Sequence, residues 1–257
     1  FGSEIVPVTY ADVTSSNTTQ GHRVLGPGYH EVATPADYEQ VLKNAGVLLQ
    51  EQRKDVILAG IKEVEAARPG SRVDMPEKVF EEVINLTEWP QVLVGTFYEE
   101  FLNVPSEIIT ESMLSNQRYF PIYDAEGKLT REFIVVSNAD PSCAERVIDG
   151  NERVVRARLD DAKFFFAEDR KKSLADRTED LKRIVFQDGL GTLFDKSQRL
   201  AAIMTFLTAK LDLPIEEGEI KHLADLAKTD LLTQMVQEFT ELQGVMGREY
   251  ALLDGEE

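Results

Sequence analysis

The spacing of apolar and polar residues divides this chain into a mixed first part and a helical last part. Short β-prone runs alternate with amphipathic segments up to about residue 140. From Pro141 onward helical periodicity dominates and no convincing strand remains. The pattern therefore predicts an α+β region followed by an all-helical region, with a boundary around residues 160–175.

Helix signals in the first part are strong. Thr34-Pro35-Ala36-Asp37 places a capping Thr before Pro at the first helical position, and this helix should stop near Gly46. A second helix is expected over residues 51–67, before Pro69-Gly70. A third should open at Asp74, with Glu77 three residues after the capping Asp. Its predicted apolar face consists of Val79, Phe80, Val83 and Leu86.

Strand signals alternate with these helices. Residues 5–10 are β-prone, residues 15–21 form a polar turn region, and residues 47–49 are a short strand candidate. Residues 91–97 predict a buried strand, and residues 105–115 a helix. A hairpin follows, with strands at 119–123 and 132–136 joined by a turn through Gly127.

The helical part contains periodic segments at 146–158, 162–169, 177–186, 198–211 and 220–239. The run Phe164-Phe165-Phe166 is typical of a buried core. Gly189-Leu190-Gly191 precedes a helix and could approach a phosphate, but a bare G-x-G favours a helix-to-helix turn.

Charge is unevenly distributed along the chain. The net charge is −18, which argues against nonspecific nucleic-acid binding. Yet residues 146–199 hold 13 Lys and Arg against 11 Asp and Glu, whereas the remainder holds 15 against 35. This basic-enriched middle could form an RNA contact strip. Charge alone favours solvated amphipathic helices, because clustering in sequence is not clustering on a surface.

Signatures of several enzyme classes are missing. The sequence has neither a Walker P-loop nor a G-x-S-x-G nucleophile elbow. Its single cysteine, Cys143, is interpreted as a partly buried structural thiol and fits a reducing cytosol. His22 and His30 lie in a loop without the spacing of metal ligands. No apolar run is long enough to span a bilayer and no signal peptide opens the chain.

The helical end contains an incomplete metal-binding pattern. His222 and Asp225, then Lys228 and Asp230, suggest the arrangement of an HD-type phosphohydrolase. Such a site needs several imidazole ligands, and Lys228 would repel a cation. We therefore expect no metal here, even if the HD architecture is present.

Candidate RNA contacts come from basic and polar residues in the middle of the chain. Arg118-Tyr119 and Asn138 flank the predicted hairpin, where structural capping is the competing interpretation. Arg153 and Arg156 share a helix face, and the basic run from Arg170 follows the Phe run. The full candidate set is Arg118, Asn151, Arg153, Arg156, Arg158, Arg170, Lys171, Lys172, Lys182 and Arg183.

Long motifs then carry a specific resemblance. The stretch 151–166 (NERVVRARLDDAKFFF), followed by 168–172 (EDRKK), resembles the β subunit of bacterial glycyl-tRNA synthetase. Segments that agree in order span nearly the whole chain. They are GHR at 21–23, EWP at 88–90, VGTF at 94–97, QRYFP at 117–121, FIVVSN at 133–138, VFQ at 185–187, LGTLFDK at 190–196, KTDL at 228–231 and ELQGVMG at 241–247. Gln20 departs from the Arg that is common there.

The resemblance implies an internal fragment of an α2β2 enzyme. A B3/B4-like α+β domain would cover residues 1–165. An all-helical HD-like domain, truncated at its C-terminal end, would cover residues 166–257. The fragment would have no catalytic site and no cofactor of its own, because ATP and Mg²⁺ act at the α subunit.

Expected partners are tRNA(Gly) and the α subunit, in the cytoplasm, with neither DNA nor a membrane. Two alternatives stay open at this point. One is a structural module bridging to the α subunit, and the other is a vestigial editing or HD phosphohydrolase domain.

Overall fold

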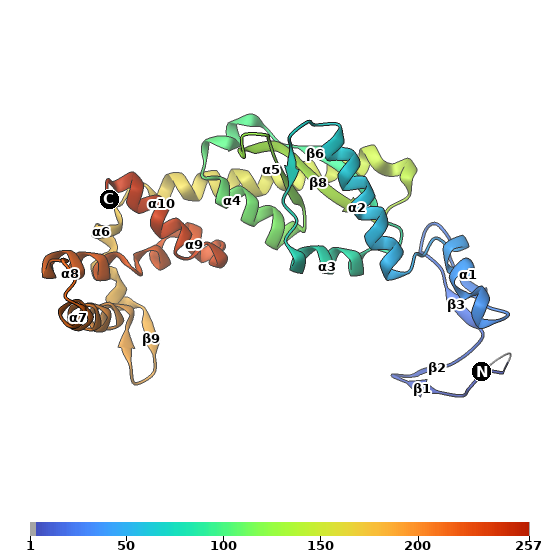
Figure 1. Cartoon of the computed structure of the whole chain (residues 1–257), viewed down its shortest axis with the longest axis horizontal. Coiled ribbons are helices and arrows are strands. Elements are labelled where there is room, and N and C mark those ends of the chain that lie inside the picture. Colours follow the sequence, from blue (N-terminus) through green and yellow to red (C-terminus); the bar gives the residue numbers. More distant parts are fainter. Residues whose placement is uncertain (1–3, 257) are drawn as a thin grey trace. The chain divides into compact units, whose positions relative to one another are not determined.

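The computed structural model describes residues 4–256 (Figure 1). The chain forms two compact units. The first comprises residues up to 99 and 113–156, and the second comprises 100–112 and residues from 157 onward. Mixed elements occupy the first unit and helices dominate the second, as the sequence pattern predicts. The division between 156 and 157 falls inside one long helix, as does the predicted domain division at 165/166.

A four-stranded antiparallel sheet organises the first unit. Its strand order is β5-β7-β8-β6. The strands are β5 (Arg72–Val73), β6 (Gln91–Thr96), β7 (Phe120–Tyr123) and β8 (Leu129–Ser137). The predicted hairpin is thus confirmed as β7–β8, with Gly127 at φ +76° in its turn. Strand β6 also confirms the strand predicted at 91–97, although most of its residues are only half-buried.

Two helices pack with one face of this sheet around the core. They are α2 (Gln50–Ala66) and α3 (Glu77–Leu86). The core contains Ile57, Ile61, Val73, Phe80, Val83, Ile84, Phe120, Ile122 and Ile134. Helix α2 lies close to β6, since a Cβ on Gly60 would come within 2.7 Å of the Val92 side chain. On the other face, Phe133 stacks on Tyr119, and Gly95 leaves room for the Phe133 ring.

Two expectations for these helices are wrong. Helix α3 begins at Glu77 with Pro76 as its N-cap, not at Asp74. The Asp74 backbone amide instead donates to the Pro121 carbonyl at 2.9 Å, which extends the β5–β7 pairing. Leu86 is 62% exposed, because the buried face continues through Ile84 and ends before the last turn.

The N-terminal segment forms two short hairpins and one helix. The hairpins pair β1 (Thr9–Tyr10) with β2 (Val13–Thr14) and β3 (Thr18–Gln20) with β4 (Tyr29–Glu31). Only the end of the β-prone run 5–10 is therefore strand, and the predicted polar turn at 15–21 contains β3. The short 3₁₀ helix Pro35–Asp37 leads into α1 (Tyr38–Asn44), which confirms the start at Thr34 and the stop before Gly46.

Residues 47–49 form no strand, contrary to expectation. The Leu48 amide makes one ladder-like bond, to the Glu88 carbonyl at 2.9 Å. The next amide, of Leu49, donates to Gln52 Oε1 at 3.1 Å, so that Leu49 caps α2. The segment therefore leads into helix α2 and does not pair as a strand.

Helix α5 (Ala144–Asp169) is one continuous element and merges the two helices expected at 146–158 and 162–169. Its first half belongs to the first unit and its second half to the second. A short 3₁₀ turn, Pro141–Cys143, precedes it. In the first unit, the Thr96 amide donates to Glu152 Oε1 at 2.7 Å, which ties α5 to the end of β6.

The second unit is a set of mostly short helices. Residues 100–112 contribute α4 (Ser106–Glu111) and most of the 3₁₀ helix Glu99–Asn103, and the π-helix Ser112–Gln117 follows. After α5 come α6 (Leu174–Arg177), a 3₁₀ helix (Thr178–Arg183), α7 (Leu193–Leu211), α8 (Glu217–Leu226), a 3₁₀ turn (Thr229–Leu232), α9 (Gln234–Glu238), another (Thr240–Leu242) and α10 (Val245–Asp254).

Two sequence expectations fail in this unit. A short hairpin, β9 (Val185–Gln187) with β10 (Gly191–Thr192), lies where no strand was expected. Gly189 (φ +75°) lies in its turn and Gly191 (φ +77°) begins β10, so this segment is not a helix-to-helix turn. The Phe run is not core either, because Phe164 is 56% exposed and its two neighbours are half-buried.

Candidate nucleic-acid interface

Arg118 is held against the first unit by its own contacts. It adopts φ +56° at the end of the π-helix, and its Nη2 donates to Glu82 Oε1 at 2.8 Å. This hydrogen bond holds the pKa of Glu82 below its ordinary value. Asn138, on the other flank of the hairpin, accepts from the amides of Glu88 and Trp89 at 2.8 Å each. Asn138 is therefore a structural cap.

The candidates on the first half of α5 differ in exposure. Asn151 accepts from the Tyr119 hydroxyl and donates to the Val147 carbonyl, so its amide joins the helix to the π-helix end. Arg153 is 71% exposed and pairs with Asp149 at 2.7 Å. Arg156 lies over the Tyr98 ring, with 4.3 Å between the guanidinium carbon and the ring centroid. Arg153 offers the most open cation of this group.

On the second unit the candidates start on the second half of α5. Arg158 and Arg170 are exposed, and Arg170 lies 5.7 Å from the Phe166 ring centroid. Lys171 pairs with Glu168 at 2.5 Å, and Lys172 with Asp180 at 2.6 Å. The Lys172 hydrogen bond is the main cause that lowers the pKa of Asp180. Exposed ion pairs of this kind are weak, about 0–1 kcal/mol, so RNA phosphates can compete for these cations.

The remaining two candidates lie at the end of the 3₁₀ helix before β9. Arg183 is 83% exposed and pairs with Asp180 at 3.2 Å. Lys182 pairs with Glu179 at 2.6 Å, and its ammonium lies 4.5 Å from the Phe194 ring centroid. The structure therefore places Lys182 and Arg183 next to hairpin β9–β10 and the start of α7.

Sequence reasoning missed two cations beside this hairpin. Lys196 lies 3.9 Å from the Phe186 ring centroid, and Arg199 is exposed one turn further along α7. Asp195, their acidic neighbour, accepts from the Thr192 amide at 2.7 Å and hydroxyl at 2.8 Å, and the amide bond is the main cause of its lowered pKa. The sequence shows that Lys196 follows the capping box of Thr192 and Asp195, but it does not show that Lys196 contacts the Phe186 ring.

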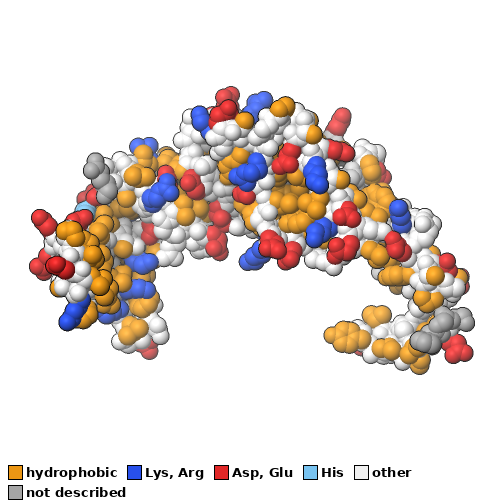
Figure 2. Space-filling view, in the orientation of Figure 1, with side chains coloured by type: hydrophobic (Ala, Val, Ile, Leu, Met, Phe, Trp, Pro, Cys, Tyr) orange, Lys and Arg blue, Asp and Glu red, His pale blue; other side chains and the backbone are white. Residues whose placement is uncertain are grey.

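Positive charge is concentrated on this part of the second unit. Residues 170–199 hold eight Lys and Arg against five Asp and Glu, whereas the rest of the chain holds 20 against 41. Figure 2 shows Lys and Arg side chains over the region of α7 and hairpin β9–β10. In an otherwise acidic chain this is the surface best suited to an RNA backbone.

A buried carboxylate joins several helices of the second unit. Asp169, at the end of α5, accepts from the backbone amides of Gln234 and Met235 at 2.9 Å and from the Tyr250 hydroxyl at 3.1 Å. Arg177 lies 3.8 Å from the same carboxylate and donates to the Asp169 carbonyl at 2.6 Å. Burial is the largest of the effects that raise the pKa of Tyr250. This network joins α5, α6, α9 and α10.

The HD-like positions are engaged in structural contacts. Asp230 is buried and accepts from the Gly244 amide at 2.5 Å, while Asp225 accepts from Gln198 at 3.1 Å. His222 is half-exposed and lies 2.6 Å from Glu256. Lys228 occupies the N-cap position of the 3₁₀ turn that contains Asp230, without a side-chain capping bond. Within residues 4–256, no group of three or more His, Cys, Asp or Glu is arranged to hold a metal ion.

The two N-terminal histidines and Cys143 also make local contacts. His22 is buried, its Nδ1 accepts from the amides of Val24 and Leu25, and its Nε2 lies 3.0 Å from the Asn138 carbonyl. His30 Nε2 lies 3.0 Å from the Gly26 carbonyl. Cys143 is half-buried, and Arg146 Nη2 lies 2.8 Å from its Sγ.

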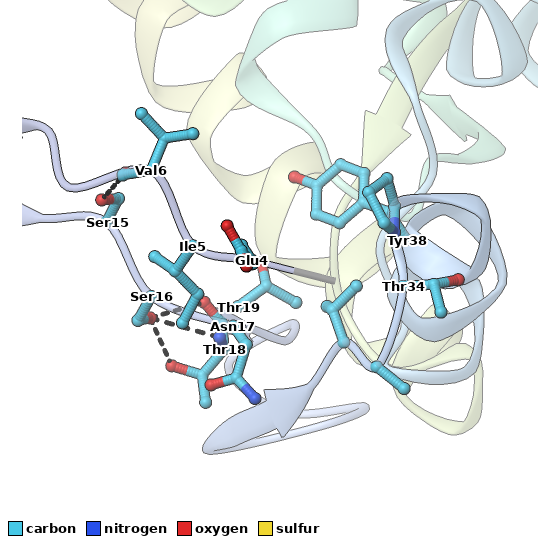
Figure 3. A pocket seen from close by; sticks show the side chains of 13 residues that line it. Glu4, Ile5, Val6, Ser15, Ser16, Asn17, Thr18, Thr19, Thr34 and Tyr38 are labelled. Carbon is cyan, nitrogen blue, oxygen red and sulfur yellow. Dashed lines mark hydrogen bonds between the residues drawn. The ribbon is translucent and has the colours of Figure 1, made fainter. Parts of the chain in front are cut away.

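A shallow pocket in the N-terminal segment does not suit RNA. It is lined by residues between Glu4 and Tyr38, mostly Ser, Thr, Asn and small apolar side chains (Figure 3). Several of its hydroxyls bond one another or the backbone, as Ser15 does with the Val6 carbonyl at 2.6 Å. Its one charged lining residue is the acidic Glu4. Among residues 4–256, no Lys, Arg or His lines it, so phosphate would meet none of these cations there.

The helices of the described residues include none with the length and apolar character needed to cross a membrane.

Comparison with known proteins agrees with the motifs. A family model described as the glycyl-tRNA synthetase beta subunit matches residues 1–257. The chain is 44% identical to the glycine–tRNA ligase beta subunit of Hahella chejuensis and 45% identical to that of Moorella thermoacetica, each over 258 residues. Both alignments cover all of this chain and 37% of the relative. The chain belongs to the glycyl-tRNA synthetase β-subunit family.

Proposed function

We propose that this chain recognises tRNA within a glycyl-tRNA synthetase, in the cytoplasm. It would bind tRNA(Gly) and the α subunit, and so support ATP-dependent charging of the tRNA with glycine at the α subunit. The observation that carries the proposal is the exposed basic surface of residues 170–199, which contrasts with the acidity of the rest of the chain. Family membership supplies the nucleic acid that such a surface would bind.

The mechanism would be positioning and not bond chemistry. Cations such as Arg170, Lys171 and Arg183 would contact the RNA backbone and fix its register, since phosphate contacts orient a complex without reading bases. The carboxylates that pair with Lys171 and Arg183 are partly exposed, so exchanging them for phosphates costs little. The neighbouring hairpin and helices would present these cations at fixed spacing.

We further propose a B3/B4-like identity for residues 1–165 and an HD-like identity for residues 166–257. The HD-like part would not hydrolyse phosphates, because Asp230 is buried and its carboxylate is occupied by the Gly244 amide. The residues present do not fit ATP with Mg²⁺ either: Gly189 lies in the hairpin turn and Gly191 in β10, and they do not form a phosphate cradle. These groups would act on the α subunit.

Charge reversal tests the proposal directly. The variant Arg170→Glu, Lys171→Glu, Arg183→Glu should weaken binding of a tRNA(Gly) transcript at least about tenfold at moderate salt, because it replaces phosphate contacts with repelling charges. Each lost phosphate contact should also lower the slope of log binding constant against log salt concentration by about 1. The matched control is Lys210→Glu, Lys221→Glu, Arg248→Glu, which makes the same charge change on other exposed residues of this unit. Equal affinities for the two variants would contradict the proposal.

A further inference from the structure

Hairpin β9–β10 and the first turns of α7 combine exposed apolar groups with cations. Val185 is 71% exposed, Leu190 47% and Phe186 36%. These side chains stand on a two-stranded hairpin with Gly189 at positive φ in its turn and Gly191 at positive φ at the start of β10. The part of the Phe186 ring that is exposed can stack against a flat group.

Two cation–ring pairs lie on this element. Lys196 covers Phe186 at 3.9 Å, and Lys182 covers Phe194 at 4.5 Å. Each pair crosses between segments: Lys196 reaches from α7 to β9, and Lys182 reaches from the preceding 3₁₀ helix to α7. Exposed cation–π contacts are worth about 0.5–1 kcal/mol, so either ammonium can leave its ring for a phosphate.

The acidic groups nearby do not cancel this character. Asp195 uses its carboxylate to cap α7 through Thr192. Asp180 is shared between Lys172 and Arg183, and Glu179 pairs with Lys182 in an exposed and therefore weak ion pair. The surface thus offers rings together with Lys182, Arg183, Lys196 and Arg199, which is the combination that binds unpaired nucleotides: bases stack on the rings and cations follow the backbone.

We propose that this surface, defined by Lys182, Arg183, Phe186, Phe194, Lys196 and Arg199, binds an unpaired single-stranded segment of RNA, with a base stacked on Phe186. The inference rests on the proposed function and narrows it, since an RNA duplex would present phosphates to the cations but no free base face to the ring.

The second unit contains a built-in comparison. On the same helix α7, Lys210 lies 5.9 Å from the ring centroid of Phe206, which is 60% exposed. The exposed neighbours of that pair are apolar, namely Ile203, Leu207 and Leu211. It therefore matches the Lys196–Phe186 pair in composition but lacks the surrounding cations. RNA should distinguish the two pairs.

The test measures binding of the 257-residue chain to a fluorescent seven-nucleotide single-stranded RNA and to a blunt-ended, fully paired RNA duplex, by anisotropy. Phe186→Ala should weaken single-strand binding about tenfold, the loss of one stacked base. It should change duplex binding less than twofold. Phe186→Tyr, which keeps the ring, should retain wild-type affinity, and Lys196→Gln should weaken single-strand binding.

The control variants are Phe206→Ala and Lys210→Gln, which should leave both affinities unchanged. Single-strand affinity that is unchanged in Phe186→Ala, or lowered equally in Phe206→Ala, would overturn the inference. Equal losses for the single strand and the duplex would also overturn it, because they would indicate a charge contact without stacking. In each case a tRNA defect of the charge-reversal variant would leave the proposed function standing.

Discussion

The buried carboxylate of Asp169 offers the sharpest test of how the second unit is held together. Its side chain is 2% exposed and accepts from two backbone amides at the start of α9 and from the Tyr250 hydroxyl. Arg177, only 12% exposed, lies beside it. The perturbation is Asp169→Ala, which removes the acceptor from the two amides and the Tyr250 hydroxyl and removes the counter-charge of Arg177, whose hydrogen bond to the Asp169 carbonyl stays.

The expected loss is large for a single substitution. A buried donor left without a partner costs about 1–3 kcal/mol, and removing one member of a buried ion pair costs about 3–5 kcal/mol. These contributions overlap because they share one carboxylate, so we expect about 4 kcal/mol in total. Asp169→Asn keeps the shape and one acceptor oxygen, and we expect it to lose about 2 kcal/mol.

Urea unfolding followed by two signals measures this. Far-UV circular dichroism follows the helices, while the only tryptophan, Trp89, reports on the first unit. The matched control is Asp160→Ala, an exposed acid on the same helix, which should stay within about 0.5 kcal/mol of wild type. An unfolding free energy for Asp169→Ala within 1 kcal/mol of this control would refute the reasoning.

Two further predictions concern the first unit. Arg68 and Glu132 form a two-point ion pair at 2.7 and 2.8 Å, and the Arg68 hydrogen bond lowers the pKa of Glu132 in the folded state. Its stabilisation is therefore present above the ordinary carboxyl pKa and lost as pH falls through the lowered pKa. Glu132→Gln should cost about 1 kcal/mol near pH 7 and almost nothing near pH 3 in urea unfolding; a pH-independent cost would contradict this. Gly95→Ala should destabilise by about 1–3 kcal/mol, because its Cβ would lie 2.7 Å from the Phe133 ring. Gly150→Ala, with open space around it, is the control, and equal melting temperatures for the two would disprove the clash.

Local signals predicted the elements that depend on neighbours in sequence. The start of the first helix at Thr34, helix α2 and hairpin β7–β8 follow from capping residues, periodicity and turn chemistry, which act over a few residues. The sequence did not predict hairpin β9–β10, because its strands are very short and the segment Gly189-Leu190-Gly191 is also typical of a helix junction.

The Phe run shows where composition misleads. Consecutive helical residues point about 100° apart, so three in a row cannot all face one core. Burial on α5 instead follows Val155, Leu159 and Ala162, and Phe166 reaches Tyr250 only from the edge. Apolar character alone does not assign a face; the register of the helix does.

The candidate RNA contacts illustrate the same division. Lys182 and Arg183 were found from charge, and Arg170 to Lys172 from their run in the sequence. The contact of Lys196 with the Phe186 ring was not predicted, because the two residues lie on different elements that only the tertiary structure brings together. The roles of Asn138 and Asp169 likewise depend on amides far away in the chain.

By itself the sequence determined the family, the α+β character of the first part and the helical character of the last, and the concentration of basic residues between them. Motifs, periodicity and charge are properties of the sequence, so they can be identified without the tertiary structure. The tertiary structure decided which of these residues make contacts within the fold and which are exposed on its surface. It did so because burial and hydrogen bonding are settled between segments far apart in sequence, where no local pattern records them.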